Sequence, residues 1–187
     1  MEALIIVDVQ NDFCPGGALP APKANEIIPV INKLMDKFDL VVASRDVHPP
    51  DTKHFDKWPP HCIQGTKGAL FHPDLNITRI RKGFHKGTGN KDDGYSAFEA
   101  TNENLMDYLL INKVTDVYVT GLTTEHCVKN TALDAVNNGF NTWIITDAIA
   151  AVEPESSDEA QALQVMKDAG ISFIDAATKC CRKHFST

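Results

Sequence analysis

Short apolar runs separated by helical patterns constrain the fold of this chain more than any other feature. The runs are rich in Val and Ile and have the length of strands, which is typical of strands buried on both faces of a sheet. Such strands are usually parallel and are joined by helices that cover the sheet. We therefore expect an α/β fold with a parallel sheet. The predicted strands run from Ala3 to Val9, Leu40 to Ala43, Val117 to Thr120, Thr142 to Ile145 and Ile171 to Ile174.

Apolar residues recur at helical spacing between most of these runs. Gly139 and Gly170 lie where the last two predicted helices should end. Pro29 falls within the first helical pattern, and we expect it early in that helix, where a missing N–H costs least. The helical patterns are Ile27, Ile31, Leu34, Met35 and Phe38; Leu105, Met106, Leu109 and Leu110; Val128, Ala132, Ala135 and Val136; and Ala160, Leu163, Met166 and Ala169.

The segment from Asp46 to Arg81 has a different character. It is rich in proline, glycine and histidine and shows little periodicity. Only its last part, from Ile77 to Arg81, predicts a strand, which would be the third along the chain. A loop this long inside a compact domain is usually functional, so we expect binding or catalytic residues in it.

Length and charge point to one domain and exclude several classes of partner. The 187 residues, 43% of them hydrophobic, suit a single domain with one sizeable core over residues 1–187. A formal net charge of -7 argues against nucleic acid or an anionic membrane as a partner. The N-terminus lacks a basic segment and a long apolar stretch, so we expect a cytoplasmic protein. The oligomeric state stays open, with a homo-oligomer as one option.

The cysteines are odd in number and lack the spacing of a zinc ribbon. In a reducing compartment we expect free thiols, and Cys14, Cys180 and Cys181 have no assigned role. Cys127 is a different case, because it lies where a predicted strand ends and a helix begins. Unpaired N–H groups and the dipole at a helix N-terminus lower a thiol's pKa and can hold an oxyanion. Cys127 is therefore a candidate nucleophile.

Other reactive side chains also follow predicted strands. In open α/β sheets ligands bind beyond the carboxyl ends of the strands, where the strand order reverses. Asp8 ends the first predicted strand and Lys86 follows the third. A base to take the proton and a cation to stabilise the thiolate would make Cys127 reactive. Asp8 as a simple turn cap and Cys127 as an inert buried residue are the alternatives.

Histidines and a carboxylate beyond the second strand suggest a metal site. Asp46 and His48 lie on one side of an extended segment, and His61 follows on a proline-stiffened loop. Together they could hold one divalent ion, with zinc favoured over iron or manganese. His54 is a weaker fourth candidate, because a loop histidine is more often solvated. Cys62 follows His61 directly and should point elsewhere, so it is left out.

Aromatic residues lie in loops beside these motifs. Phe13, Trp58 and Tyr95 could stack on a flat ring substrate. For each of them alone, packing within its loop is the simpler interpretation.

Several of these motifs, in this order, resemble the nicotinamidase/pyrazinamidase family of the isochorismatase-like cysteine hydrolases. The resemblance extends from the first strand to about Asp147, and the combination of motifs is highly specific. The motifs are Asp8-Val9-Gln10-Asn11-Asp12-Phe13, Arg45-Asp46-Val47-His48-Pro49, Trp58-Pro59-Pro60-His61-Cys62, Lys86 followed by Asp93-Gly94-Tyr95-Ser96-Ala97-Phe98, and Gly121-Leu122-Thr123-Thr124-Glu125-His126-Cys127-Val128.

The resemblance implies a three-layer, doubly wound fold with a six-stranded parallel sheet. It also implies hydrolysis of nicotinamide to nicotinate and ammonia in NAD salvage, through a cysteine thioester, with activity on pyrazinamide as well. In this family the metal is thought to anchor the pyridine nitrogen. The implied roles are a triad of Asp8, Lys86 and Cys127; metal ligands Asp46, His48 and His61; an aromatic pocket of Phe13, Trp58 and Tyr95; and an oxyanion hole from the N–H groups of Thr123 and Cys127, next to a cis peptide between Leu122 and Thr123.

One position departs from the family pattern as we interpret it. Where we expect a further histidine ligand, this chain has Thr52, and His54 comes two residues later. Either the loop shifts to bring His54 in, or water completes the coordination.

Three other functions stay open at this point. A related cysteine amidohydrolase could act on another small carbamoyl or ureido compound, because the fold does not fix the substrate. A metallohydrolase could use metal-bound hydroxide, with Cys127 structural. A module that binds a flat ligand without turnover would give no reason for a base, a cation and a thiol at three strand ends.

Overall fold

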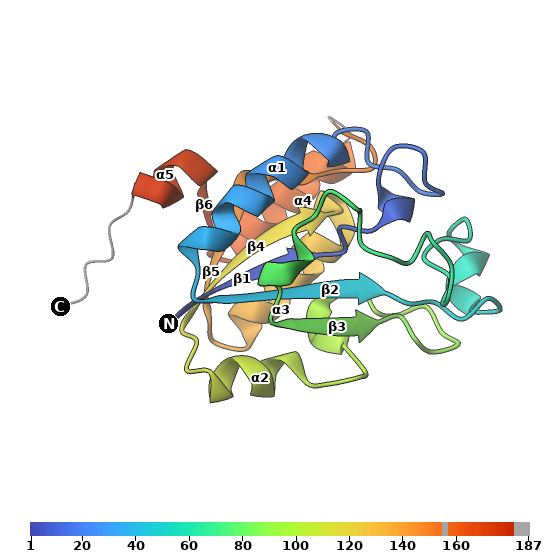
Figure 1. Cartoon of the computed structure of the whole chain (residues 1–187), viewed down its shortest axis with the longest axis horizontal. Helices are drawn as coiled ribbons and strands as arrows, with labels where there is room; N and C mark the ends of the chain where they lie inside the picture. The colour runs from blue at the N-terminus through green and yellow to red at the C-terminus, as the bar shows by residue number, and fades with distance from the viewer. Residues whose placement is uncertain (155–156, 182–187) are drawn as a thin grey trace.

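The computed structural model describes residues 1–154 and 157–181, which form an α/β fold around one parallel sheet (Figure 1). The sheet has six strands in the order β3-β2-β1-β4-β5-β6, and every pair of neighbours is parallel. This confirms the predicted fold class. The strands are β1 (Glu2–Val7), β2 (Leu40–Asp46), β3 (Lys82–Lys86), β4 (Asp116–Leu122), β5 (Asn141–Ala150) and β6 (Ser172–Ile174).

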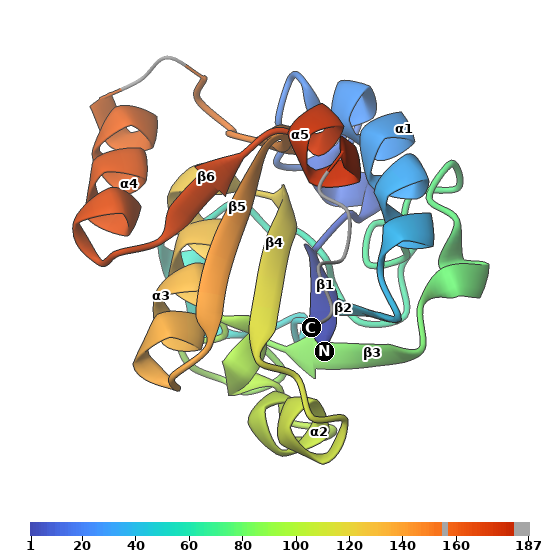
Figure 2. The same cartoon turned by 90° about the vertical axis from the view of Figure 1, so that its left-hand side faces the viewer.

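Helices cover both faces of the sheet, because apolar side chains alternate between the faces along each strand. Leu4 and Ile6 of β1 pack on the side of α1, whereas Ile5 and Val7 pack on the side of α2 and α3. Figure 2 shows α1 and α5 on one side of the strands and α3 on the other. The helices are α1 (Ala24–Leu34), α2 (Leu105–Ile111), α3 (Lys129–Asn137), α4 (Ser157–Asp168) and α5 (Ala176–Cys181), with a π-helical turn η6 (Thr124–Val128) before α3.

Two local predictions are wrong. The third strand is Lys82–Lys86, while Ile77–Arg79 forms a 3-10 turn capped by the Asn76 side chain. The strand escaped prediction because it lies at the sheet edge and carries little apolar sequence, whereas Ile77 is 56% exposed. Pro29 lies inside α1 beyond its first turn. It is tolerated there because it is on the exposed side of the helix, where water can reach the freed carbonyl.

The helix-end glycines and the cysteines behave as expected. Gly139 and Gly170 have φ of 87° and 84° directly after α3 and α4, a conformation that glycine adopts without steric cost. All five cysteines are free thiols. No helix in residues 1–154 and 157–181 combines the length and the apolar character needed to cross a bilayer.

The strand order reverses between β1 and β4, which places the ends of these two strands side by side. Gly121 pairs with Val7 there and has φ of 106°. A Cβ atom at Gly121 would lie 2.0 Å from the Val7 carbonyl oxygen, so no side chain fits between the strands. The loops beyond this point extend past the strand arrowheads in Figure 1.

We expect Gly121→Ala to destabilise the fold by more than about 3 kcal/mol, because β1 and β4 must separate to admit the methyl group. Urea denaturation measures the loss. Gly139→Ala is the matched control: it has a similar positive φ but nothing within 4 Å of the added Cβ. The control should lose only the backbone term of about 1–2 kcal/mol. Equal losses in the two variants would contradict the close approach of the strands.

Candidate active site

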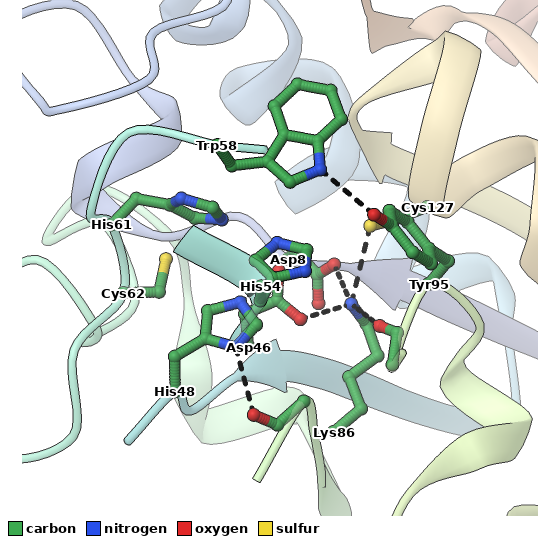
Figure 3. Close-up of polar contacts among 12 residues, drawn as sticks. Asp8, Asp46, His48, His54, Trp58, His61, Cys62, Lys86, Tyr95 and Cys127 are labelled. Atoms are coloured by element: carbon green, nitrogen blue, oxygen red, sulfur yellow. Dashed lines mark hydrogen bonds and ion pairs between the residues drawn. The ribbon is translucent and has the colours of Figure 1, made fainter. Parts of the chain in front are cut away.

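The ends of β1, β3 and the turn after β4 bring Asp8, Lys86 and Cys127 together (Figure 3). Lys86 Nζ lies 2.7 Å from Asp8 Oδ2 and 3.4 Å from Cys127 Sγ. A carboxylate oxygen of Asp8 and Cys127 Sγ are within 4.8 Å of each other. Asp8 and Lys86 are fully buried, and Cys127 is 7% exposed. An acid, an amine and a thiol that are remote in sequence therefore share one small volume.

Asp8 is held by its neighbours in a strained backbone conformation. Its φ of 48° lies in the left-handed region, which is uncommon for residues other than glycine. The Ser44 hydroxyl donates to Asp8 Oδ1 at 2.7 Å, so the carboxylate has one oxygen fixed and the other facing Lys86. Burial raises the pKa of Asp8 to about 6, although the Lys86 charge opposes this. A carboxyl group with this pKa can both accept and donate a proton near neutral pH.

Lys86 is a buried ammonium surrounded by acceptors. Its Nζ donates to Asp46 Oδ1 at 2.5 Å and to the Gly94 carbonyl at 2.7 Å. Burial by itself lowers the pKa of Lys86, but the charges of Asp46 and Asp8 outweigh it and hold the pKa well above its usual value. Lys86 therefore stays charged and neutralises the two carboxylates.

The Cys127 thiol differs from the sequence expectation in one respect. Burial, with Asp8 and Asp46 nearby, raises its pKa well above the usual value, although Lys86 opposes the rise. These effects outweigh the lowering expected from a helix N-terminus, so that prediction is wrong. The thiol is protonated, and its activation requires a base nearby. The N–H groups of His126 and Val128 donate to the Thr123 carbonyl at 3.1 Å and fix the turn that carries Cys127. The cis peptide between Leu122 and Thr123 is confirmed.

Three histidines gather beside this triad. Ligand atoms of His48, His54 and His61 lie within 4.8 Å of one another, and all three residues are buried. Asp46 Oδ2 is 3.6 Å from His48 Nε2, while its other oxygen binds Lys86. Burial by itself raises the pKa of Asp46, but the charge of Lys86 opposes this and helps to hold the pKa below its usual value. Asp46 thus belongs to both groups of side chains.

The histidine nitrogens fit a metal ion. The Nδ1 atoms of His48 and His61 lie 2.9 Å and 2.7 Å from the carbonyls of Gly87 and Pro59. Carbonyls only accept, so each Nδ1 carries the proton and each Nε2 keeps its lone pair. His48 Nε2 is buried without a hydrogen-bond partner among the described residues. Such an orphaned nitrogen beside a carboxylate is what a metal ligand looks like without its ion.

His54 lies in the cluster, and Thr52 does not. Thr52 caps the 3-10 turn Lys53–Asp56 by accepting from the His54 N–H, and its hydroxyl donates to the Gly89 carbonyl at 3.0 Å. This turn directs His54 inward, where its ring stacks on His48 at 4.4 Å. Burial lowers the pKa of His54 to about 4, so the imidazole is neutral at pH 7. Of the two options for this position, the geometry favours a loop that brings His54 in.

The three predicted aromatic residues line a cavity at this site. Phe13 packs against His61, and Trp58 Nε1 donates to the Tyr95 hydroxyl at 2.9 Å. Cys127, Asp46 and Thr123 also line the cavity, whereas Cys62 does not. A small flat molecule would therefore contact aromatic rings, the histidine cluster and the thiol at once.

Sequence reasoning missed several residues of the site. Gln10 clamps the backbone of Asp46: its side chain donates to the Asp46 carbonyl and accepts from the Asp46 N–H, both at 2.8 Å. Ser44 could have been found, because it lies two residues before Asp46 on the same face of β2. Leu19, His126 and Val152 also line the cavity. His126 lies in one of the family motifs but was given no role, and no sequence signal marked the other two.

The isochorismatase domain family matches residues 2–178, which is nearly the whole chain. The chain belongs to the isochorismatase family. A nicotinamidase/pyrazinamidase of Mycobacterium tuberculosis is 39% identical over 189 residues, covering 93% of this chain and 98% of that protein. The recognition of this family from sequence motifs is thereby confirmed.

Solved structures of isochorismatase-family proteins have the same fold. A pyrazinamidase of Pyrococcus horikoshii in complex with zinc has a TM-score of 0.83 and 43% identity, covering 93% of this chain and 98% of that one. The PnC1 protein of L. infantum in complex with nicotinate has a TM-score of 0.89 and 34% identity, covering 95% and 93%. The site of the present chain therefore lies in a fold that serves carboxamide hydrolysis in its relatives.

Proposed function

We infer that this protein is a nicotinamidase, which hydrolyses nicotinamide to nicotinate and ammonia. One observation carries this inference: Lys86 contacts both Asp8 and Cys127, and Cys127 lines an aromatic cavity together with His54 and His61. Relatives that resemble the chain over nearly its full length are nicotinamidases, and one related structure holds nicotinate. A thiol, a base and a buried ammonium are the groups that nucleophilic attack on a carboxamide requires.

In the first half of the reaction Cys127 is the nucleophile. Asp8 takes the thiol proton as Sγ attacks the carboxamide carbon, and Lys86 stabilises the developing thiolate. The N–H groups of Thr123 and Cys127 hold the oxyanion that forms. Asp8 then returns the proton to the amide nitrogen, the C–N bond breaks, and ammonia leaves. A thioester between Cys127 and the ring acid remains.

In the second half, water replaces ammonia. Asp8 accepts a proton from the water that attacks the thioester carbon, and the same donors hold the oxyanion. The C–S bond breaks, Cys127 regains its proton from Asp8, and nicotinate leaves. Asp8 serves both halves because its pKa of about 6 lies near neutral pH.

The cavity accounts for a small flat substrate. Phe13, Trp58 and Tyr95 offer ring faces, and His48, His54 and His61 with Asp46 would hold one divalent ion, which we propose is zinc. A related pyrazinamidase structure contains zinc, and imidazole-rich sites suit it, with iron or manganese as alternatives. When bound, the ion supplies a Lewis acid for a ring nitrogen. The protein groups orient the carboxamide toward Cys127.

The pKa of Asp8 predicts an acid limb in the pH profile. Below pH of about 6 the Asp8 carboxyl is protonated and cannot accept the thiol proton, so kcat/KM should fall about tenfold per pH unit. Steady-state ammonia release over a pH series measures it, with metal content determined at each pH to separate loss of the ion. An acid limb near pH 4 would show that Asp8 is not the titrating base.

Ammonia release from a panel of small amides tests the assignment. We expect turnover of nicotinamide and pyrazinamide, and loss of turnover after chelation with recovery on added Zn²⁺. Faster turnover of ureido or carbamoyl compounds would instead favour a related amidohydrolase. Saturable binding without ammonia release would identify a binding module and overturn the proposal.

A further inference from the structure

Asp92 connects the histidine cluster to the aromatic wall of the cavity. It lies in the loop between β3 and the next 3-10 turn and is partly buried. Its Oδ1 is 3.0 Å from His54 Nδ1 and 2.6 Å from the Tyr95 hydroxyl. Its Oδ2 pairs with the exposed Lys57 ammonium. One carboxylate therefore contacts a candidate metal ligand and a candidate substrate-binding residue.

The contact with His54 fixes the tautomer of that imidazole. Asp92 Oδ1 accepts from the Tyr95 hydroxyl and Oδ2 pairs with the Lys57 ammonium, so the side chain faces His54 as a carboxylate acceptor. His54 Nδ1 must then carry the proton, and the lone pair resides on Nε2. His48 and His61 obtain the same tautomer from backbone carbonyls. His54 is the one histidine of the cluster whose tautomer depends on a side chain.

The contact with Tyr95 fixes the aromatic wall. The Tyr95 O–H donates to Asp92. The same oxygen accepts from Trp58 Nε1–H at 2.9 Å, and Figure 3 shows this second hydrogen bond. Trp58 and Tyr95 come from loops that are far apart in sequence and meet through this hydrogen bond. Without the carboxylate, the Tyr95 hydroxyl loses its acceptor and the two rings lose their common orientation.

We propose that Asp92 is a positioning residue that sets the metal-binding tautomer of His54 and the orientation of the Tyr95–Trp58 wall. Asp92 does not line the cavity, so it acts through these residues. Its role toward the substrate rests on the proposed function, whereas its role toward the metal does not. Carboxylates that orient metal-binding histidines typically change metal affinity by 10–100-fold when they are removed.

Zinc affinity is the first test. Metal-free wild type, Asp92→Asn and Asp92→Ala are titrated with Zn²⁺ against a chromophoric chelator. We expect affinity to fall roughly 10- to 100-fold in both variants. Asp93→Asn is the matched control, because among the described residues this neighbouring carboxylate forms an ion pair with the exposed Lys91 ammonium alone. Wild-type affinity in Asp92→Ala, or an equal loss in Asp93→Asn, would overturn the proposal.

A spectroscopic measurement separates positioning from general support of the fold. In metal-free wild type at pH 7, imidazole nitrogen shifts of His54 should report protonated Nδ1 and unprotonated Nε2. Asp92→Ala should show a mixture of tautomers at His54 alone, with His48 and His61 unchanged. If Asp92→Ala does not fold, Asp92→Leu, which also has no side-chain acceptor, carries the same test. An unchanged His54 tautomer in a folded variant contradicts the proposal.

Kinetics at saturating Zn²⁺ test the second part of the proposal, the orientation of Tyr95 and Trp58. Asp92→Asn should raise KM for nicotinamide several-fold with a smaller change in kcat, because Asp92 does not touch the reacting atoms. Tyr95→Phe should raise KM but keep wild-type zinc affinity, which separates the effect on substrate binding from the effect on the metal. A fall in kcat with unchanged KM would contradict the role of Asp92 in orienting Tyr95 and Trp58. If wild type released no ammonia from nicotinamide, the proposed function would fail while the zinc and tautomer results still tested Asp92.

Discussion

Replacing Cys127 by alanine should lower kcat for ammonia release from nicotinamide by roughly 10⁴- to 10⁶-fold, the range seen when a catalytic nucleophile is removed. The reason is structural as well as chemical: of the described cysteines, only Cys127 lines the cavity. Asp8 and Lys86 then have no thiol to activate. Steady-state ammonia release, with zinc content measured in parallel, gives the result.

The control variant and the alternative mechanism define what would contradict this prediction. Cys180→Ala removes an exposed thiol outside the cavity and should leave turnover unchanged. Cys127→Ala should keep its zinc, because the histidines hold the candidate metal site without it. Substantial turnover in zinc-loaded Cys127→Ala would show that a metallohydrolase mechanism operates and that the thiol is structural.

Replacing Lys86 by methionine should abolish turnover and destabilise the metal-free protein by about 3–5 kcal/mol, the usual effect of leaving a buried charge without its partner. Lys86 is fully buried between Asp8 and Asp46, and both carboxylates would lose their counter-charge. Urea denaturation of metal-free wild type and variant measures the difference. Metal-free protein is required because a bound cation would partly neutralise Asp46.

The destabilisation in Lys86→Met should depend on pH in a defined direction. Without the ammonium, the pKa values of Asp8 and Asp46 in the folded state rise above those in the unfolded chain. Protonation then favours the folded state, so the loss of stability should be smaller at pH 5 than at pH 8. Lys91→Met, which removes an exposed lysine, should change stability by less than about 0.5 kcal/mol. A pH-independent loss would mean that packing, not charge, is what Lys86 contributes.

The central strands were predictable because they are buried on both faces. Val and Ile recur in them with few polar interruptions. Asp8, Asp46 and Cys127 follow these strands, and their positions made them site candidates. The edge strand was not predictable in the same way. This strand, β3, buries one apolar side chain, Phe84. Its sequence, Lys82-Gly83-Phe84-His85-Lys86, is more typical of a loop. Lys86 was still found, because the motif around it identified it without a correct strand.

Contacts between loops account for what sequence reasoning missed. Asp92 and His54 are separated by 38 residues, and nothing in their local sequence fixes how the two loops meet. Strand pairing sets a register between distant residues, whereas loops have no comparable rule. The inward position of His54 likewise depends on the Thr52 cap and on its contact with Gly89.

The crowding at Gly121 determines how near the acid and the sulfur can come. Asp8 directly follows Val7, and Cys127 follows Gly121 by one short turn. Because Gly121 has no side chain, β1 and β4 can approach closely, and this approach limits the distance between the Asp8 carboxylate and the Cys127 sulfur. A proton transferred between these two groups therefore has only a short path, and a side chain at position 121 would lengthen it.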